Sequence, residues 1–229
     1  MSYISEHGIK AVCFDIDGTL YPKSQTNRIL VKTALADLPF ALRYLMMRRK
    51  MREEDGFSDF PLSSADDFKR RELAIMYGER KDLDWFLEKE RSVFHAKWEE
   101  EFLSVRMFPG MADFLRDLKK IVPVAFLTDF PVGTKLKAMG IEDVPQFVIC
   151  SEDIGHLKPS RLPFRLLSER LCLNAEEILY VGDSEKKDVL GARNAGMKSL
   201  LITKDARKAK KSAADLVVSS YAEMREKLL

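Results

Sequence analysis

The sequence has few of the residues that mark secreted, membrane-spanning or nucleic-acid-binding proteins. Three of its 229 residues are cysteine (Cys13, Cys150 and Cys172), an odd number that is too small for a disulfide framework. Lysine and arginine (38) nearly balance aspartate and glutamate (36), and the net charge of +2 gives no extended basic surface for nucleic acid. The least charged long stretch, residues 33–47, is too short to span a bilayer, and the N-terminal MSYISEHGIK lacks the apolar core of a signal peptide. We therefore expect a cytoplasmic protein that binds neither nucleic acid nor membrane.

Short apolar runs alternate with helical patterns along most of the chain. Hydrophobic residues make up 46% and charged residues 32%, which is the composition of a folded protein. Runs rich in β-forming residues predict buried strands at residues 11–17, 122–128, 146–150, 178–182, 199–203 and 216–218. Helical patterns separate them at residues 111–120, 132–139, 162–171 and 187–195. This alternation predicts a mostly parallel sheet covered on both faces, an α/β fold with a three-layer, Rossmann-like core.

Residues 21–105 break the alternation and show only helical patterns. The first pattern places apolar residues on one face of a long helix that is interrupted at Pro39: Val31, Leu35, Leu38, Leu42 and Leu45. A second helix is expected to begin at Ser63 or Ser64 and to end near Gly78, and a third covers residues 83–98. We predict an inserted all-helical domain at residues 21–105, within an α/β core formed by residues 1–20 and 106–229.

Two clusters in this insert have both a functional and a structural interpretation. The basic run at residues 48–52 could bind an anion, but acidic residues follow directly, which favours a solvated helix end. A group of aromatic and methionine side chains could line a substrate pocket: Phe40, Tyr44, Met46, Met47 and Met51. The core of the helical domain is the favoured interpretation of that group.

Polar residues follow four of the predicted strands at the point where each strand ends. They are Asp15 and Asp17 after the first strand, Thr128 and Asp129 after the second, Lys158 after the third strand and a short loop, Asp183 after the fourth, and Asp188 at the start of the helix that follows. Because the carboxyl ends of parallel strands meet at one edge of a sheet, we expect these side chains to converge there.

The chemistry of this set favours phosphoryl transfer. Clustered carboxylates without cysteine or histidine are oxygen ligands suited to Mg²⁺, and lysine and threonine can hold phosphate oxygens. One carboxylate can attack a phosphoryl group to form an acyl phosphate. A second can protonate the departing alcohol and later take a proton from water.

Four motifs in this order resemble those of haloacid dehalogenase-superfamily hydrolases that carry a helical (C1-type) cap. They are FDIDGTL at residues 14–20, Thr128 after an apolar strand, the Lys158-Pro159 pair, and VGDSEKKD at residues 181–188. The resemblance covers residues 8–20 and 106–203, and the helical insert lies where cap-bearing members have theirs.

The resemblance implies a role for each matched residue. Asp15 would be the nucleophile and also a ligand of Mg²⁺. Asp17 would be the general acid and base, and its backbone carbonyl would bind the metal. Thr128 and Lys158 would hold the phosphoryl group, and Asp183 would be the third protein ligand of the metal.

Two further acids have less certain places in this scheme. The resemblance implies that Asp188 supports the metal site from its periphery, although an acid in the first turn of a helix is also favoured by the helix dipole. Asp129 stands where asparagine is common in the family and is counted here among the phosphate-binding residues. Whether either acid touches the metal is left open by the sequence.

The function predicted from these residues is a Mg²⁺-dependent phosphatase that hydrolyses a small phosphorylated metabolite through an aspartyl-phosphate at Asp15. A dehalogenase is disfavoured, because it needs no second acid at the position of Asp17. A phosphonate hydrolase or a phosphomutase of the same family stays open, as does a phospho-accepting signalling or binding module without turnover. The sequence does not identify the substrate or the oligomeric state.

Overall fold

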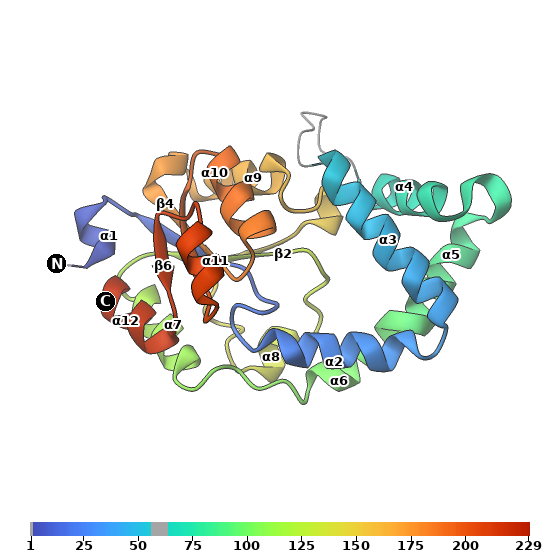
Figure 1. Cartoon of the computed structure of the whole chain (residues 1–229), viewed down its shortest axis with the longest axis horizontal. Coiled ribbons are helices and arrows are strands. Elements are labelled where there is room, and N and C mark those ends of the chain that lie inside the picture. Colours follow the sequence, from blue (N-terminus) through green and yellow to red (C-terminus); the bar gives the residue numbers. More distant parts are fainter. Residues whose placement is uncertain (1, 56–63) are drawn as a thin grey trace.

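The described residues of the chain, 2–55 and 64–229 of a computed structural model, contain one sheet of six parallel strands (Figure 1). The strand order is β3-β2-β1-β4-β5-β6, which places the first strand of the chain in the middle of the sheet. The strands are β1 Ala11–Phe14, β2 Val124–Thr128, β3 Val148–Cys150, β4 Ile178–Gly182, β5 Lys198–Ile202 and β6 Leu216–Val218. The predicted parallel sheet is confirmed, with β1, β2 and β3 shorter than their apolar runs.

Helices cover both faces of the sheet, because alternate side chains of each strand point to opposite faces. On one face, Cys13 and Tyr180 belong to a core cluster with Phe164 of α9 (Arg161–Leu171). On the other face, Phe14 and Phe126 belong to a cluster with residues of α7 (Met111–Lys119) and α12 (Tyr221–Leu228). The helices and short turns outside the insert are α1 Tyr3–Glu6, α7 Met111–Lys119, α8 Lys135–Ala138, η3 Glu152–Ile154, α9 Arg161–Leu171, η4 Ala175–Glu177, η5 Glu185–Val189, α10 Leu190–Asn194, α11 Ala206–Lys211 and α12 Tyr221–Leu228. The predicted three-layer α/β core is therefore confirmed.

The described elements between β1 and α7 are all helical and lie to one side of the sheet (Figure 1). They are α2 Lys23–Ala34, α3 Leu38–Asp55, α4 Ala65–Tyr77, η1 Gly78–Arg80, α5 Leu83–Glu90, η2 Arg91–His95 and α6 Ala96–Phe102. Helix α4 begins with a capping box in which Ser64 and Asp67 satisfy each other's backbone amides, and it ends at Gly78 with φ 61°. Ser63, the alternative start, lies outside the described residues. None of the described helices has the length and apolar character needed to cross a membrane.

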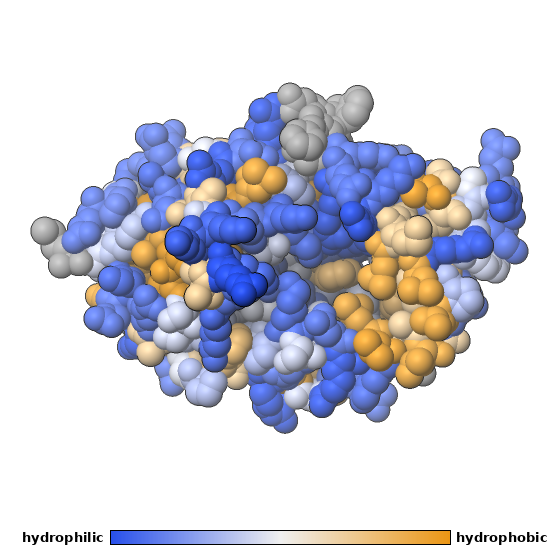
Figure 2. All heavy atoms as spheres, in the orientation of Figure 1, coloured by the Kyte–Doolittle hydropathy of each residue, from blue (hydrophilic) through white to orange (hydrophobic). Residues whose placement is uncertain are grey.

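The first apolar face predicted within the insert is not a buried face. The break comes before Pro39, which occupies the first turn of α3, where proline is tolerated. Leu35 is 73% exposed and Leu42 is 53% exposed, and Figure 2 shows an apolar area over α2 and α3. Helix α3 instead buries Phe40, Tyr44, Met47 and Met51, which recur at the same spacing on another face. Because both faces have helical periodicity, spacing alone could not select between them.

Candidate active site

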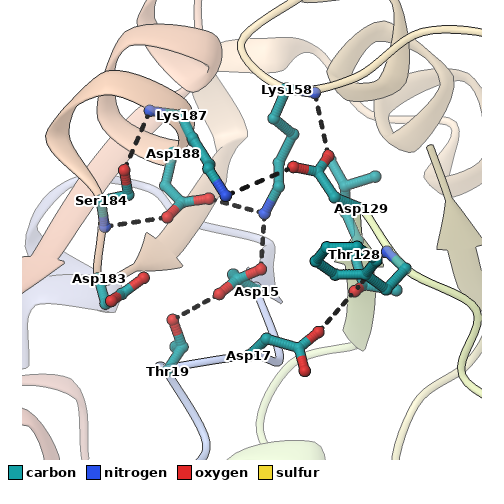
Figure 3. A network of polar contacts seen from close by, with 12 residues as sticks. Asp15, Asp17, Thr19, Thr128, Asp129, Lys158, Asp183, Ser184, Lys187 and Asp188 are labelled. Atoms are coloured by element: carbon teal, nitrogen blue, oxygen red, sulfur yellow. Dashed lines mark hydrogen bonds and ion pairs between the residues drawn. The ribbon is translucent and has the colours of Figure 1, made fainter. Parts of the chain in front are cut away.

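Asp15 lies at the centre of the carboxyl edge of the sheet, directly after β1, and is held by two donors (Figure 3). The Lys158 ammonium lies 2.6 Å from its Oδ1, and the Thr19 hydroxyl donates to its Oδ2 at 2.9 Å. Lys158 is 1% exposed and also contacts Asp188 Oδ1 at 2.7 Å and the Tyr180 hydroxyl at 3.2 Å. A buried cation therefore separates two buried carboxylates.

The charge states of this trio follow from burial and from the ion pairs. Burial raises the pKa of Asp15 to about 6; the Lys158 charge opposes that shift, and the charge of Asp188 adds to it. Burial alone would lower the pKa of Lys158, but Asp15 and Asp188 raise it well above its usual value. Above pH 6 the pair is thus a carboxylate and an ammonium, which leaves Asp15 as an anion able to attack phosphorus.

Three of the predicted residues form a group with the donor chemistry of a divalent cation site. Carboxylate oxygens of Asp15, Asp183 and Asp188 lie within 4.8 Å of one another. The backbone nearby is shaped to admit them: a Cβ on Gly18, which has φ +103°, would lie 2.7 Å from Asp183 Oδ2. A Cβ on Gly182 would lie 2.3 Å from Asp188 Cβ. The acidic cluster could therefore bind a divalent cation, and two glycines make room for it.

The side chain of Asp17 points away from this group, toward the helical insert. Its carboxylate accepts hydrogen bonds from Thr128 Oγ1 at 3.1 Å, from the Tyr21 hydroxyl, and from Lys135 Nζ at 3.0 Å. Burial opposes ionisation, but Lys135 and the hydrogen bonds from Tyr21 and Thr128 outweigh it, so the pKa of Asp17 lies below its usual value. Asp17 is consequently ionised in this arrangement.

Asp129 is a buried anion surrounded by cations. Its Oδ1 accepts from the backbone amide of Lys158 at 3.0 Å, and its Oδ2 contacts Arg52 Nη2 at 2.9 Å and Lys187 Nζ at 3.8 Å. Burial opposes ionisation, but the charges of Arg52, Lys158 and Lys187 hold the pKa of Asp129 far below its usual value. An ionised carboxylate cannot donate a hydrogen bond to a phosphate oxygen. Asp129 can therefore contribute to phosphate binding only by positioning Arg52, Lys187 and the backbone of Lys158.

Two arginines of α3 reach the carboxyl edge of the sheet, which the sequence analysis did not predict. Arg48 is 3% exposed, donates from Nη2 to the backbone carbonyl of Asp129 at 2.8 Å, and contacts Glu152 at 2.5 Å. Arg52 binds the Asp129 carboxylate, as described above. The expectation of a solvated helix end is therefore wrong for Arg48 and Arg52, although it holds for Arg49 between them, whose side chain is 83% exposed. The four-residue spacing of Arg48 and Arg52, on the face that carries Tyr44, was the available signal.

Arg48 belongs to a buried charge cluster that joins the insert to the core. Lys69 of α4 contacts Glu72, Glu90 and Glu152 at 2.9, 2.7 and 3.1 Å, and Arg48 also contacts Glu72 at 3.2 Å. Glu152 follows β3, whereas the other members lie in the insert. Burial raises the pKa of Glu72 to about 7 against the opposing charges of Lys69 and Arg48. The buried ion pairs of Arg48 and Lys69 with Glu152 therefore hold the helical insert against the α/β core.

Comparisons with known proteins relate this chain to a protein family. The model of the haloacid dehalogenase-like hydrolases matches residues 9–196. A ribulose-1,5-bisphosphate 5-phosphatase of Halopiger xanaduensis is 27% identical over 83% of this chain and 83% of its own, and a glyceraldehyde 3-phosphate phosphatase of Methanothermobacter thermautotrophicus is 27% identical over 89% of each. Among solved structures, the hydrolase YfnB of Bacillus subtilis superposes with a TM-score of 0.67 at 19% identity, over 96% of this chain and 98% of that one. At 19% identity, the similarity to YfnB is evidence for the fold alone.

Proposed function

The chain belongs to the haloacid dehalogenase-like hydrolases, and we propose that it is a phosphatase that hydrolyses a small phosphorylated metabolite through an aspartyl-phosphate at Asp15. The observation that carries the proposal is the environment of Asp15, an anion held between Lys158 and Thr19 at the edge of an acidic cluster. The phosphatase names of the two relatives support the same reaction. The cytoplasmic location and the lack of nucleic-acid or membrane partners stay predictions.

The divalent cation of this proposal is Mg²⁺, which suits a site of oxygen ligands next to a phosphate. Asp15, Asp183 and the backbone carbonyl of Asp17 would hold it, with Asp188 at the periphery of the site. When bound, the ion supplies positive charge that neutralises both the carboxylates and the phosphoryl oxygens. Lys158, which contacts both Asp15 and Asp188, supplies a second positive charge, and the Thr128 hydroxyl would turn from Asp17 to donate a hydrogen bond to the phosphoryl group.

The proposed reaction has two steps, and each uses residues described above. In the first, an Asp15 oxygen attacks phosphorus, the ester P–O bond breaks, and the departing alkoxide takes a proton from Asp17. Although Asp17 is ionised in the arrangement described above, the negative charge of a bound phosphate opposes its ionisation and favours the protonated form. In the second step, a water molecule gives a proton to Asp17, and the water oxygen attacks phosphorus. The bond between phosphorus and Asp15 then breaks, which releases phosphate and restores Asp15.

The insert at residues 21–105 acts in this proposal as a cap that covers the carboxyl edge of the sheet. Arg48 and Arg52 reach into the site from α3, and this supports a closed arrangement that excludes water from the reacting groups. Asp129 then has a supporting role, because it holds Arg52 and the backbone of Lys158 next to the phosphoryl position.

Phosphate release from acetyl phosphate and phenyl phosphate in the presence of Mg²⁺ tests this function. The parent should turn over many times, and Asp15→Asn should be inactive because an amide lacks the nucleophilic charge. Asp113→Asn on α7 is the matched control, since this side chain is 83% exposed and its ion pair is with Arg116 of the same helix. A folded Asp15→Asn variant that keeps activity within about tenfold of the parent would contradict the assignment of the nucleophile.

A further inference from the structure

Large apolar side chains form an exposed patch on the helical insert, at the junction of α2 and α3. Their exposed fractions run from 51% for Leu38 to 73% for Leu35, and Figure 2 shows an apolar area over these two helices. The members of this α2–α3 patch are Val31, Leu35, Leu38, Leu42, Leu45 and Met46. Single exposed leucines are ordinary on a protein surface, whereas a contiguous apolar group of this size marks an interaction surface.

The α2–α3 patch is separate from the core of the insert. On its inner face, α3 buries Phe40 and Tyr44, and the Phe40 ring lies 6.1 Å from that of Phe86 in α5, measured between centroids. At 100° per residue, Leu42 and Leu45 lie on the opposite face of α3. A helix that is apolar on two opposite faces needs a partner for each of them. The rest of the insert covers the inner face, and no element of the described chain covers the outer one.

We propose that the α2–α3 patch is the interface of a homodimer, in which it packs against the same patch of a second copy of this chain. Its members together expose about 600 Å², so that two copies would bury about 1,200 Å², the lower end of the range for specific, stable interfaces. The members are all aliphatic or methionine, and homodimer interfaces are more apolar than those of proteins that associate transiently. Twofold dimers are also the commonest assemblies of soluble proteins.

The spacing of residues on α3 makes the patch complementary to itself. Leu38 and Met46 lie four residues before and after Leu42, which is about 6 Å along the helix axis in each direction. With a twofold axis beside Leu42, the α3 helices of the two copies run antiparallel and Leu42 faces its counterpart. Leu38 of each copy then faces Met46 of the other. Each of these side chains thus has an apolar partner, which an interface made from one patch used twice requires.

The charges at the two ends of the patch fit a second copy better than a membrane. Asp37, next to Leu38, pairs with Lys89 at 2.6 Å, and Arg49, one turn beyond the patch, pairs with Glu53 at 3.0 Å. Each end therefore carries both signs of charge, which gives little repulsion between two copies. A helix that lies on an anionic membrane combines lysine and arginine with tryptophan, phenylalanine or leucine, and the patch has no aromatic member.

Sedimentation velocity and light scattering of the purified protein test the proposal. The chain has a mass of 26.3 kDa, and the parent should have twice this mass at about 100 μM, because the affinity of interfaces can be as weak as micromolar. At submicromolar concentrations the chain should be monomeric. Leu42 is then a surface residue, and its removal costs the single chain little.

Two matched variants assign the interface to the patch. Leu42→Glu should be monomeric at about 100 μM, because it places two carboxylates beside each other at the twofold axis, away from water. Ile121→Glu is the control and should stay dimeric. Ile121 lies between α7 and β2 in the α/β core and is 58% exposed, against 53% for Leu42. Met46→Glu replaces Leu42→Glu if circular dichroism shows that the latter does not fold.

The contradicting results are distinct from one another. A monomeric parent at about 100 μM overturns the proposal, and so does a dimer that persists in whichever folded variant is used. Vesicles of phosphatidylglycerol and phosphatidylcholine provide the membrane arm of the test. A parent that binds them as a monomer assigns the patch to a lipid surface and overturns the dimer.

A cysteine at position 42 tests the twofold arrangement itself. In a Cys172→Ser background, which removes the exposed natural thiol, Leu42→Cys should be linked into dimers by a short bismaleimide whose reach matches the about 8–10 Å between packed helices. Ile121→Cys in the same background is the control and should stay unlinked. Equal linking of the two variants, or none at position 42, overturns a twofold axis beside Leu42. None of these measurements depends on the reaction that the protein catalyses.

Discussion

Replacing Asp15 by asparagine should make the metal-free protein more stable at neutral pH, although it removes the proposed nucleophile. Asp15 is buried, and burial raises its pKa from 3.8 to about 6. A carboxyl group whose pKa is higher in the folded state favours folding fully below its unfolded pKa, and this contribution is lost as the pH rises through the folded value. The penalty for ionisation therefore develops between pH 4 and pH 6 and stays constant above.

The size of the effect follows from the two pKa values. At 1.36 kcal/mol for each pH unit between them, ionisation of Asp15 costs the folded state about 3 kcal/mol at pH 7.5. Asparagine resembles the protonated acid in shape and cannot ionise. In chelator, Asp15→Asn should therefore unfold at higher urea than the parent at pH 7.5, and the difference should disappear near pH 4.

Urea unfolding at pH 4, 5, 6 and 7.5, followed by circular dichroism in chelator, measures this difference. Asp113→Asn is the control for removal of an acid on the surface and should follow the parent at each pH. Adding Mg²⁺ should stabilise the parent more than Asp15→Asn, since a ligand stabilises the state that binds it. A variant that is less stable than the parent at pH 7.5, or a difference that does not change with pH, would refute the electrostatic account of the site.

Three other substitutions test separate parts of the account. Asp17→Asn should slow single-turnover cleavage of alkyl phosphates more than that of aryl phosphates, by up to about 10²–10⁴-fold, and equal losses would reject Asp17 as the acid. Arg48→Met should lower the free energy of unfolding in urea by about 3–5 kcal/mol because it removes one of the two cations that neutralise the buried carboxylates of Glu72 and Glu152, whereas Arg49→Met should have little effect; similar values for the two would contradict the buried cluster. Phe40→Ala should cost about 3–5 kcal/mol, and Leu42→Ala about 0.5 kcal/mol or less, and the reverse order would mean that α3 is oriented differently.

The carboxyl edge of the sheet could be predicted because short-range patterns determine it. An apolar run such as residues 178–182 defines a strand, and the residue after it, Asp183, is then placed at the edge by the parallel topology. The same reasoning predicts the positions of Asp15 and Thr128, which lie where β1 and β2 end. These positions depend on where a strand ends, which the sequence specifies locally.

The contribution of the helical insert could not be predicted in the same way. Whether Arg48 or Arg49 is buried depends on how α3 is rotated against the core. The spacing of Arg48 and Arg52 places them on the face of Tyr44, but it does not show that this face is the buried one. The apolar face that contains Leu42 was a plausible core face for the same reason. Lys135 was missed because its partner, Asp17, is 118 residues away in the chain.

Trapping of the covalent intermediate tests the central claim most directly. The parent is mixed with acetyl phosphate and Mg²⁺, quenched within the first turnovers, and treated with borohydride, which reduces an aspartyl-phosphate to homoserine. Peptide mass spectrometry should find homoserine at position 15 in the parent and none in Asp15→Asn. Homoserine at another aspartate, or steady turnover without any at position 15, would contradict an aspartyl-phosphate at Asp15.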